Sequence, residues 1–196
     1  VGRDKAVLIM HTNPGDINGQ NLDAIKRDLG LTDQELIIDP QTVTQEFLSF
    51  CYNVSDVTIN ISDAEGFGLS TLESLSCGVP IIVNMTGGLQ EQVTDGENWF
   101  GVGIEPASKA IVGTQDIPYI YEDRVCGEDV VDALVKLCEM PEEERKALGE
   151  LGRQHVKENY NFDNHEKLWV DLMTNLHEKH GSWPTKLFKG WELLEV

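Results

Sequence analysis

Segments rich in apolar and β-branched residues alternate with amphipathic segments along most of this chain of 196 residues. The first kind is typical of strands that are covered on both faces, and it occurs at residues 6–10, 36–38, 57–61, 80–84 and 99–104. Between these strands, apolar residues at helical spacing predict helices at residues 17–29, 47–51, 69–77 and 89–94. The alternation favours an α/β fold, a Rossmann-like parallel sheet flanked by helices.

The alternation stops after residue 104. Residues 105–126 contain prolines, a glycine and two tyrosines, which predict an ordered insertion rather than a flexible linker. Helical spacing returns at 128–139, after Pro141, and at 163–177, where we expect an apolar stripe of Leu168, Trp169, Leu172, Met173 and Leu176 to belong to the core. We therefore assign residues 1–178 to one domain, with the insertion at 105–126, and residues 179–196 to a C-terminal tail.

Charge and composition exclude several classes of protein. The 34 acidic and 15 basic residues give a net charge of −19, which repels phosphate backbones and anionic lipid, so we expect no nucleic-acid partner. A hydrophobic content of 40% supports a core, but no apolar run is long enough for a stable membrane span. The four scattered cysteines and the lack of a signal-peptide pattern predict reduced thiols and a cytoplasmic location.

The predicted topology indicates where a ligand would bind. In open parallel sheets, ligands lie at the carboxyl ends of the strands. Those ends fall here at residues 11–13, 39–43, 62–68 and 85–88.

The third of these segments carries the most informative residues. A strand ends near Ile61, and a glycine-containing loop leads into a helix that begins near Leu69. We expect Gly66 and Gly68 to adopt positive φ and to permit close approach of a ligand. The free N–H groups and the dipole of the helix start favour an anion there, so the loop is a candidate phosphate site.

Two carboxylates flank this candidate phosphate site. Glu65 lies in the loop, and Glu73 lies about one turn into the helix. A carboxylate accepts two hydrogen bonds and matches a vicinal diol, such as that of a ribose or a hexose. A diphosphate at the helix start, with a sugar on either side, would place one diol near each glutamate. This arrangement fits a nucleotide-diphosphate sugar.

The segment from Glu65 to Glu73 resembles the E-x7-E signature of the retaining nucleotide-sugar glycosyltransferases of the GT-B fold, the group 1 glycosyltransferases. The surrounding sequence is similar to that family too, in the same order and spacing, from about residue 5 to 178, apart from 105–126. The matching fragments are Ser55-Asp56-Val57, Glu65-Gly66-Phe67-Gly68-Leu69, Glu73-Ser74, Gly78-Val79-Pro80-Ile81-Ile82, Gly87-Gly88, Glu144-Arg145, Gly149, Gly152-Arg153 and Tyr160-Asn161-Phe162.

The resemblance implies a role for each matching position. Glu73 would hold the ribose of a UDP- or GDP-sugar donor, and Glu65 would be the catalytic residue, in contact with hydroxyls of the donor sugar. The loop from Pro40 to Val43 would lie against the base. The diphosphate would be held by the loop and the helix start, namely Gly66, Phe67, Gly68, Leu69, Ser70 and Thr71, and the turn of Gly87 and Gly88 would border the cleft. The resemblance implies neither a metal ion nor a cofactor, and it leaves the acceptor unknown.

The sequence also departs from the family's pattern. Family members carry an Arg and a Lys on the first strand-helix unit of this domain, and we find no matching segment, nor an N-terminal acceptor-binding domain. We therefore expect the chain to be most of a C-terminal donor-binding domain that transfers sugar inefficiently by itself. The missing strand would leave a gap in the sheet, which favours domain swapping or a homodimer.

Two other functions remain open at this point. A nucleotide-sugar epimerase would use the same fold, although epimerases lack the E-x7-E pattern. A non-catalytic module that binds a nucleotide sugar or another chain would use the open strand edges and the tail aromatics Trp183 and Trp191. Asp63 and Glu65 also suggest a metal site, which would need a third oxygen ligand that the sequence does not provide.

Overall fold

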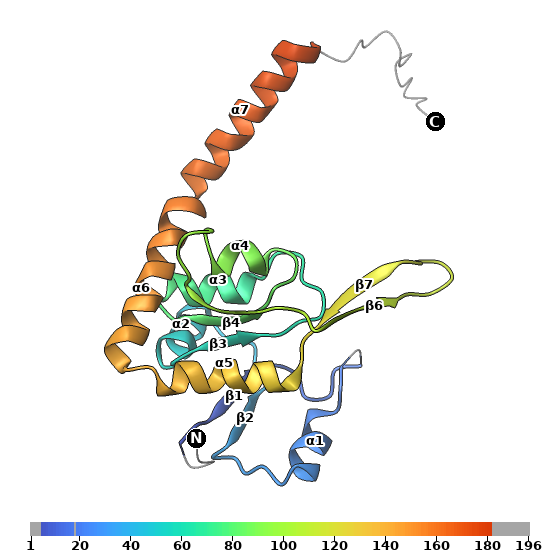
Figure 1. Cartoon of the computed structure of the whole chain (residues 1–196), viewed down its shortest axis with the longest axis vertical. Coiled ribbons are helices and arrows are strands. Elements are labelled where there is room, and N and C mark those ends of the chain that lie inside the picture. Colours follow the sequence, from blue (N-terminus) through green and yellow to red (C-terminus); the bar gives the residue numbers. More distant parts are fainter. Residues whose placement is uncertain (1–4, 18, 182–196) are drawn as a thin grey trace, which may run out of the picture. The chain divides into compact units, whose positions relative to one another are not determined.

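A computed structural model describes residues 5–17 and 19–181 (Figure 1). These residues form seven strands and seven helices, most of them near the positions that the sequence predicts. In chain order they are β1 (Leu8–His11), α1 (Leu22–Asp28), β2 (Leu36–Asp39), α2 (Gln45–Asn53), β3 (Thr58–Asn60), α3 (Leu69–Ser76), β4 (Ile81–Asn84), α4 (Leu89–Val93), β5 (Gly101–Ile104), β6 (Ser108–Val112), β7 (Ile120–Arg124), α5 (Gly127–Glu139), α6 (Glu142–Asn159) and α7 (Phe162–His180). The chain divides into two compact units, Val1–Gln154 and His155–Val196.

The expected α/β fold is confirmed, but the parallel strands form two sheets rather than one. β1 pairs with β2, and β3, β4 and β5 form a separate sheet in that order, with every pairing parallel. In the part of the chain that the structure describes, β3 does not pair with β1, so one edge of each of these two strands has no strand beside it.

The three-stranded sheet contains the core of the first unit. All four residues of its central strand β4 are buried, which explains the continuous apolar run at this position. Helices α3 and α4 cover one face and α5 the other (Figure 1). The α5 side is closed by a cluster of Ile82 and Ile104 from the sheet with Ala133 and Leu137 from the helix.

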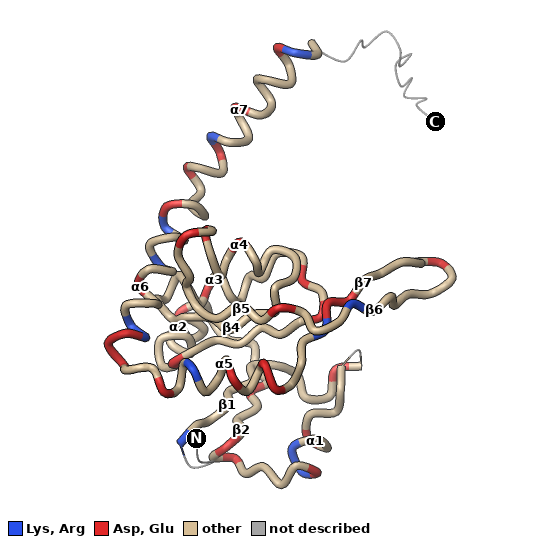
Figure 2. The backbone as a smooth tube through the Cα atoms, viewed as in Figure 1, with Lys and Arg blue, Asp and Glu red and all other residues tan. Residues whose placement is uncertain are grey.

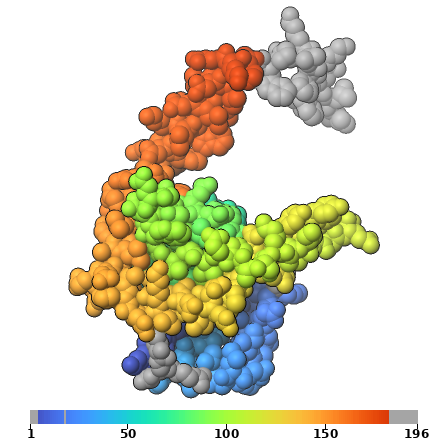
Figure 3. Space-filling model, viewed as in Figure 1, coloured from blue at the N-terminus to red at the C-terminus, as the bar shows by residue number. Residues whose placement is uncertain are grey.

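The predicted insertion is an antiparallel hairpin. Strands β6 and β7 pair from Ser108–Arg124 at the base to Val112–Ile120 near the tip. The hairpin projects from the three-stranded sheet (Figures 1 and 3). Its outer half carries exposed apolar side chains, among them Ile111, Tyr119 and Tyr121.

The second unit contains the long helix α7, which begins at an Asn161 N-cap that accepts a hydrogen bond from the Asn164 N–H. The expectation that its apolar stripe is core is wrong. The five side chains of the stripe are between 45% and 67% exposed, and helix α7 has no buried residue. The predicted tail, except for residues 179–181, lies outside the described residues, as do Trp183 and Trp191. No helix in the described part of the chain has the length and apolar character needed to cross a bilayer.

Candidate functional site

The predicted loop and helix are present at the carboxyl end of β3. Helix α3 begins at Leu69 after the N-cap Gly68, whose φ of +85° places it in the left-handed region that glycine adopts without strain. A Cβ at Gly68 would lie 2.6 Å from the Leu89 side chain, so space also requires glycine there. The prediction of a positive φ is wrong for Gly66, because its φ is not positive, and a Cβ there would meet open space.

The turn after β4 lies directly against this loop. A Cβ on Gly87 would lie 1.7 Å from the Glu65 carbonyl oxygen, and one on Gly88 would lie 2.8 Å from the carbonyl oxygen of Phe67. The Gly88 N–H donates to the Gly66 carbonyl at 3.2 Å. The two glycines therefore allow the two strand-end loops to meet backbone to backbone. The structure brings together the segments 65–73 and 87–88 that the sequence singled out.

Buried polar contacts fix the start of α3. The Gln92 side chain, fully buried on α4, donates to the Phe67 carbonyl at 2.5 Å. Its Oε1 lies 2.6 Å from the Thr71 hydroxyl, which is also 2.8 Å from the Gly68 carbonyl. Thr71 is fully buried, so its hydroxyl holds the loop in place rather than facing a ligand. By contrast, Leu69 and Ser70 are exposed, and no side chain caps the N–H groups of this first turn.

Each candidate carboxylate has a neutral neighbour. Asn60, the last residue of β3, donates to Glu65 at 3.3 Å. The Tyr52 hydroxyl on α2 donates to Glu73 at 2.9 Å. Burial raises the pKa of the Tyr52 phenol, and the hydrogen bond to Glu73 raises it further, so Tyr52 remains a donor at neutral pH.

Negative charge is not neutralised at these two glutamates. In the described part of the chain, no Lys or Arg forms an ion pair with Glu65 or Glu73. Basic residues are sparse along the backbone, and two of them, Lys109 and Arg124, lie on the hairpin strands (Figure 2). The Glu122 carboxylate raises the pKa of Arg124, and the charge of Asp63 contributes to the shift. Both cations are paired with carboxylates of the hairpin, Lys109 with Asp123 at 3.2 Å and Arg124 with Glu122 at 2.7 Å.

The sheet break separates two predicted strand-end segments from this group, residues 11–13 after β1 and the loop of Pro40 and Val43. This loop follows β2, in the two-stranded sheet, which shares no strand pairing with the sheet that carries Glu65. Its place against a nucleotide base stays a prediction. A metal role for Asp63 and Glu65 gains no further ligands, since no group of three or more His, Cys, Asp or Glu side chains gathers among the described residues.

Sequence reasoning missed several residues that hold the site. The most informative is Gln92, because a fully buried amide stands between Leu89 and Val93, which are both core residues of α4. Asn84 ends the buried strand β4 in the same way. A polar residue within an apolar run is a usable signal, since buried polar groups need partners. Tyr52 gave no such signal, because only the packing of α2 against α3 brings it to Glu73.

The arrangement can bind an anion between two hydroxyl-binding groups. Uncapped N–H groups at the start of α3 point toward the loop, where the helix dipole favours negative charge. Glu65 and Glu73 are both able to accept from hydroxyls, one before the helix and one in its second turn. The fixed backbone contacts of Gly87 and Gly88 keep the loop in shape before a ligand arrives.

Comparison with known sequences identifies relatives of this chain. The sequence profile of the family "Glycosyl transferases group 1" matches residues 18–114. A D-inositol 3-phosphate glycosyltransferase 2 from Catenulispora acidiphila is 31% identical over 136 residues, which are 66% of this chain and 31% of the relative. A D-inositol 3-phosphate glycosyltransferase from Acidothermus cellulolyticus is 39% identical over 92 residues, 46% of this chain and 20% of the relative. The chain thus spans a third or less of the length of these relatives.

Solved structures share the fold. Sucrose-phosphate synthase from Thermosynechococcus elongatus aligns with a TM-score of 0.64 and 21% identity over 87% of this chain and 39% of that protein. The C-terminal domain of a group 1 glycosyl transferase from Francisella tularensis aligns with a TM-score of 0.52 and 23% identity over 72% of this chain and 61% of that domain. The profile match and the relatives identify residues 18–114 as a segment of the group 1 glycosyltransferase family, and the solved structures show the GT-B fold.

Proposed function

We propose that this chain is the donor-binding domain of a retaining glycosyltransferase that transfers a sugar from a UDP- or GDP-sugar to an acceptor. In this proposal the start of α3 binds the diphosphate, Glu73 binds the ribose, and Glu65 contacts hydroxyls of the donor sugar. Helix dipole and basic side chains act in place of a metal ion. Such a domain contributes to catalysis by binding the donor and stabilising the leaving diphosphate.

One observation carries the proposal most directly. Glu65 and Glu73 flank an uncapped helix start, and the backbone of the turn of Gly87 and Gly88 touches the Glu65 loop. An exposed acidic loop without a binding role would not require glycines at 87 and 88 to pack directly against its backbone. The membership of the chain in a glycosyltransferase family supports the assignment of the anion as a nucleotide-diphosphate sugar.

Isothermal titration of the chain with UDP and GDP tests the proposal. Glu73→Ala should weaken binding of the preferred nucleotide by about tenfold, because it removes charge-assisted hydrogen bonds to the ribose. Glu91→Ala is a matched control, an acidic side chain on the exposed surface of the neighbouring helix α4. Equal affinity of the wild type and Glu73→Ala would refute the ribose assignment, and no affinity for either nucleotide would refute the proposal.

We propose that the chain acts within a longer enzyme, since it covers 31% and 20% of two of its relatives. We propose that an acceptor-binding domain and an Arg–Lys pair for the leaving diphosphate complete it, in the cytoplasm, with an acceptor that remains to be identified. The acidity of the site supports this proposal, because neither glutamate is paired with a cation in the described residues. Among the described residues, one edge of β1 and one edge of β3 pair with no strand, which supports a homodimer, and sedimentation equilibrium would test this by mass.

A further inference from the structure

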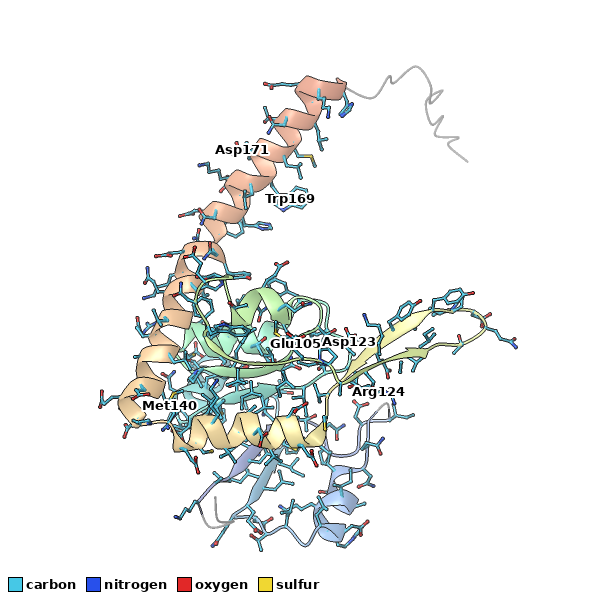
Figure 4. All side chains as sticks on the ribbon, viewed as in Figure 1. Glu105, Asp123, Arg124, Met140, Trp169 and Asp171 are labelled. Atoms are coloured by element: carbon cyan, nitrogen blue, oxygen red, sulfur yellow. The ribbon has the colours of Figure 1, made fainter. Side chains whose placement is uncertain are left out.

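Asp123 joins the base of the hairpin to the candidate site. Asp123, the fourth residue of β7, lies where the hairpin meets the strand-end loops (Figure 4). Its N–H donates to the Asp63 carbonyl at 2.7 Å, in the loop that leads to Glu65. Its carboxylate accepts from the Thr86 hydroxyl at 2.9 Å, directly before Gly87. One hairpin residue therefore binds the two loops that form the site.

The buried side-chain amide of Asn84 joins the loop after β3 to the base of the hairpin. Asn84 is fully buried, and its Nδ2 donates to the Ser62 carbonyl at 2.9 Å and to the Asp123 carbonyl. The hairpin thus replaces water as the partner of polar groups at the ends of β3 and β4. Loss of a buried partner leaves a group unsatisfied, which costs more than the hydrogen bond contributes. The contact of Asp123 with Asn84 therefore satisfies a buried polar group at the end of the sheet.

The carboxylate of Asp123 is held charged in this position. Its hydrogen bond from Thr86 lowers its pKa, as does Lys109, whose Nζ lies 3.2 Å from the other carboxylate oxygen. Lys109 and Asp123 are paired across the hairpin. Charge-assisted hydrogen bonds are stronger than neutral ones, so the ionised carboxylate strengthens the bond from Thr86.

We propose that Asp123 is a positioning residue for donor-sugar binding: through Asp63 and Thr86 it fixes the loop of Glu65 against the turn of Gly87 and Gly88. This inference rests on the proposed function and adds a residue from the inserted hairpin to it. The nucleotide end of the site is held separately. The start of α3 is fixed by Gln92 and Glu73 is bonded by Tyr52, so neither depends on Asp123.

The two separate supports predict a selective effect. Asp123→Ala should weaken binding of a nucleotide sugar about 5- to 10-fold, the effect of one lost charge-assisted hydrogen bond. It should leave the affinity for the free nucleotide within about twofold, because the contacts at the start of α3 remain. We would titrate the chain with UDP-glucose, GDP-mannose, UDP and GDP. Asp123→Asn should restore nucleotide-sugar binding, since its amide oxygen still accepts from Thr86.

Matched variants separate positioning from general destabilisation. Thr86→Val should reproduce the loss, and Thr86→Ser should not, because only valine lacks the hydroxyl. Glu122→Ala, next to Asp123 but bonded to Arg124, should leave both affinities unchanged. Equal loss for nucleotide and nucleotide sugar in Asp123→Ala, or no loss for either, would overturn the inference.

Hydrogen exchange distinguishes this failure from that of the proposed function. The Gly88 amide, bonded to the Gly66 carbonyl, should exchange faster in Asp123→Ala than in the wild type, with or without a ligand. If the wild type binds none of the four compounds, the proposed function fails. Unchanged exchange at Gly88 would overturn the positioning role by itself.

Discussion

The backbone contact between the two strand-end loops yields the sharpest prediction, a Gly87→Ala substitution. Gly87 has a φ of +49°, and a Cβ there would lie 1.7 Å from the Glu65 carbonyl oxygen. The left-handed conformation costs alanine about 1–2 kcal/mol, and the shift of the Glu65 loop adds about 1–3 kcal/mol. Alanine also restricts the unfolded chain, which offsets about 0.4–1 kcal/mol of this cost. We expect a net loss of about 1–5 kcal/mol in the free energy of unfolding.

Two other glycines isolate the steric part of this cost. Gly30 has a φ of +61° and Gly96 a φ of +94°, and a Cβ at either position meets no heavy atom within 4 Å. Alanine at these positions has only the backbone cost and its offset, so each variant should lose about 0–1.6 kcal/mol. Urea unfolding followed by circular dichroism measures all three variants. A loss for Gly87→Ala that equals those of Gly30→Ala and Gly96→Ala would refute the close packing of the loops.

Three further substitutions test separate parts of the structure. Gly66→Ala, which meets open space, should change the free energy of unfolding by less than about 0.5 kcal/mol, yet weaken nucleotide-sugar binding severalfold in calorimetry, and unchanged binding would place the ligand elsewhere. The wild type should lose stability above about pH 10, because the Tyr52 phenol ionises in the unfolded chain before it ionises in the folded chain. Tyr52→Phe should not show this loss. The stability gap between wild type and Tyr52→Phe should therefore shrink above that pH in urea titrations, and a constant gap would contradict the buried phenol. Arg145→Met should cost about 1–2 kcal/mol, since Arg145 bonds Asp56 at 2.6 Å and the Met140 carbonyl at 3.1 Å. Lys146→Met, whose ion pair with Glu142 is exposed, should cost clearly less than Arg145→Met in the same assay, and equal costs would argue against the role of Arg145.

Much of the site could be predicted from the sequence because its geometry is local. The spacing of Glu65 and Glu73 around a helix start is set by the chain itself, and the structure has α3 begin at Leu69 as expected. The turn of Gly87 and Gly88 was identified by its place after a strand, and the parallel pairing of β3 with β4 brings it to the same edge of the sheet. Neighbouring strands in a parallel sheet bring such segments together without further information.

Other features depend on pairings that no periodicity encodes. The pattern of apolar runs determined which segments become strands, since burial on both faces requires apolar residues, but not that β1 and β2 would form a sheet of their own. Likewise it marked residues 105–126 as an ordered insertion. Only the tertiary structure places Asp123 against Asp63 and Thr86, because these contacts join residues 37 to 60 positions apart through backbone groups and short side chains. The sequence by itself thus determined the elements and the local carboxylate–helix motif, and the tertiary structure decided which long-range contacts hold that motif in place.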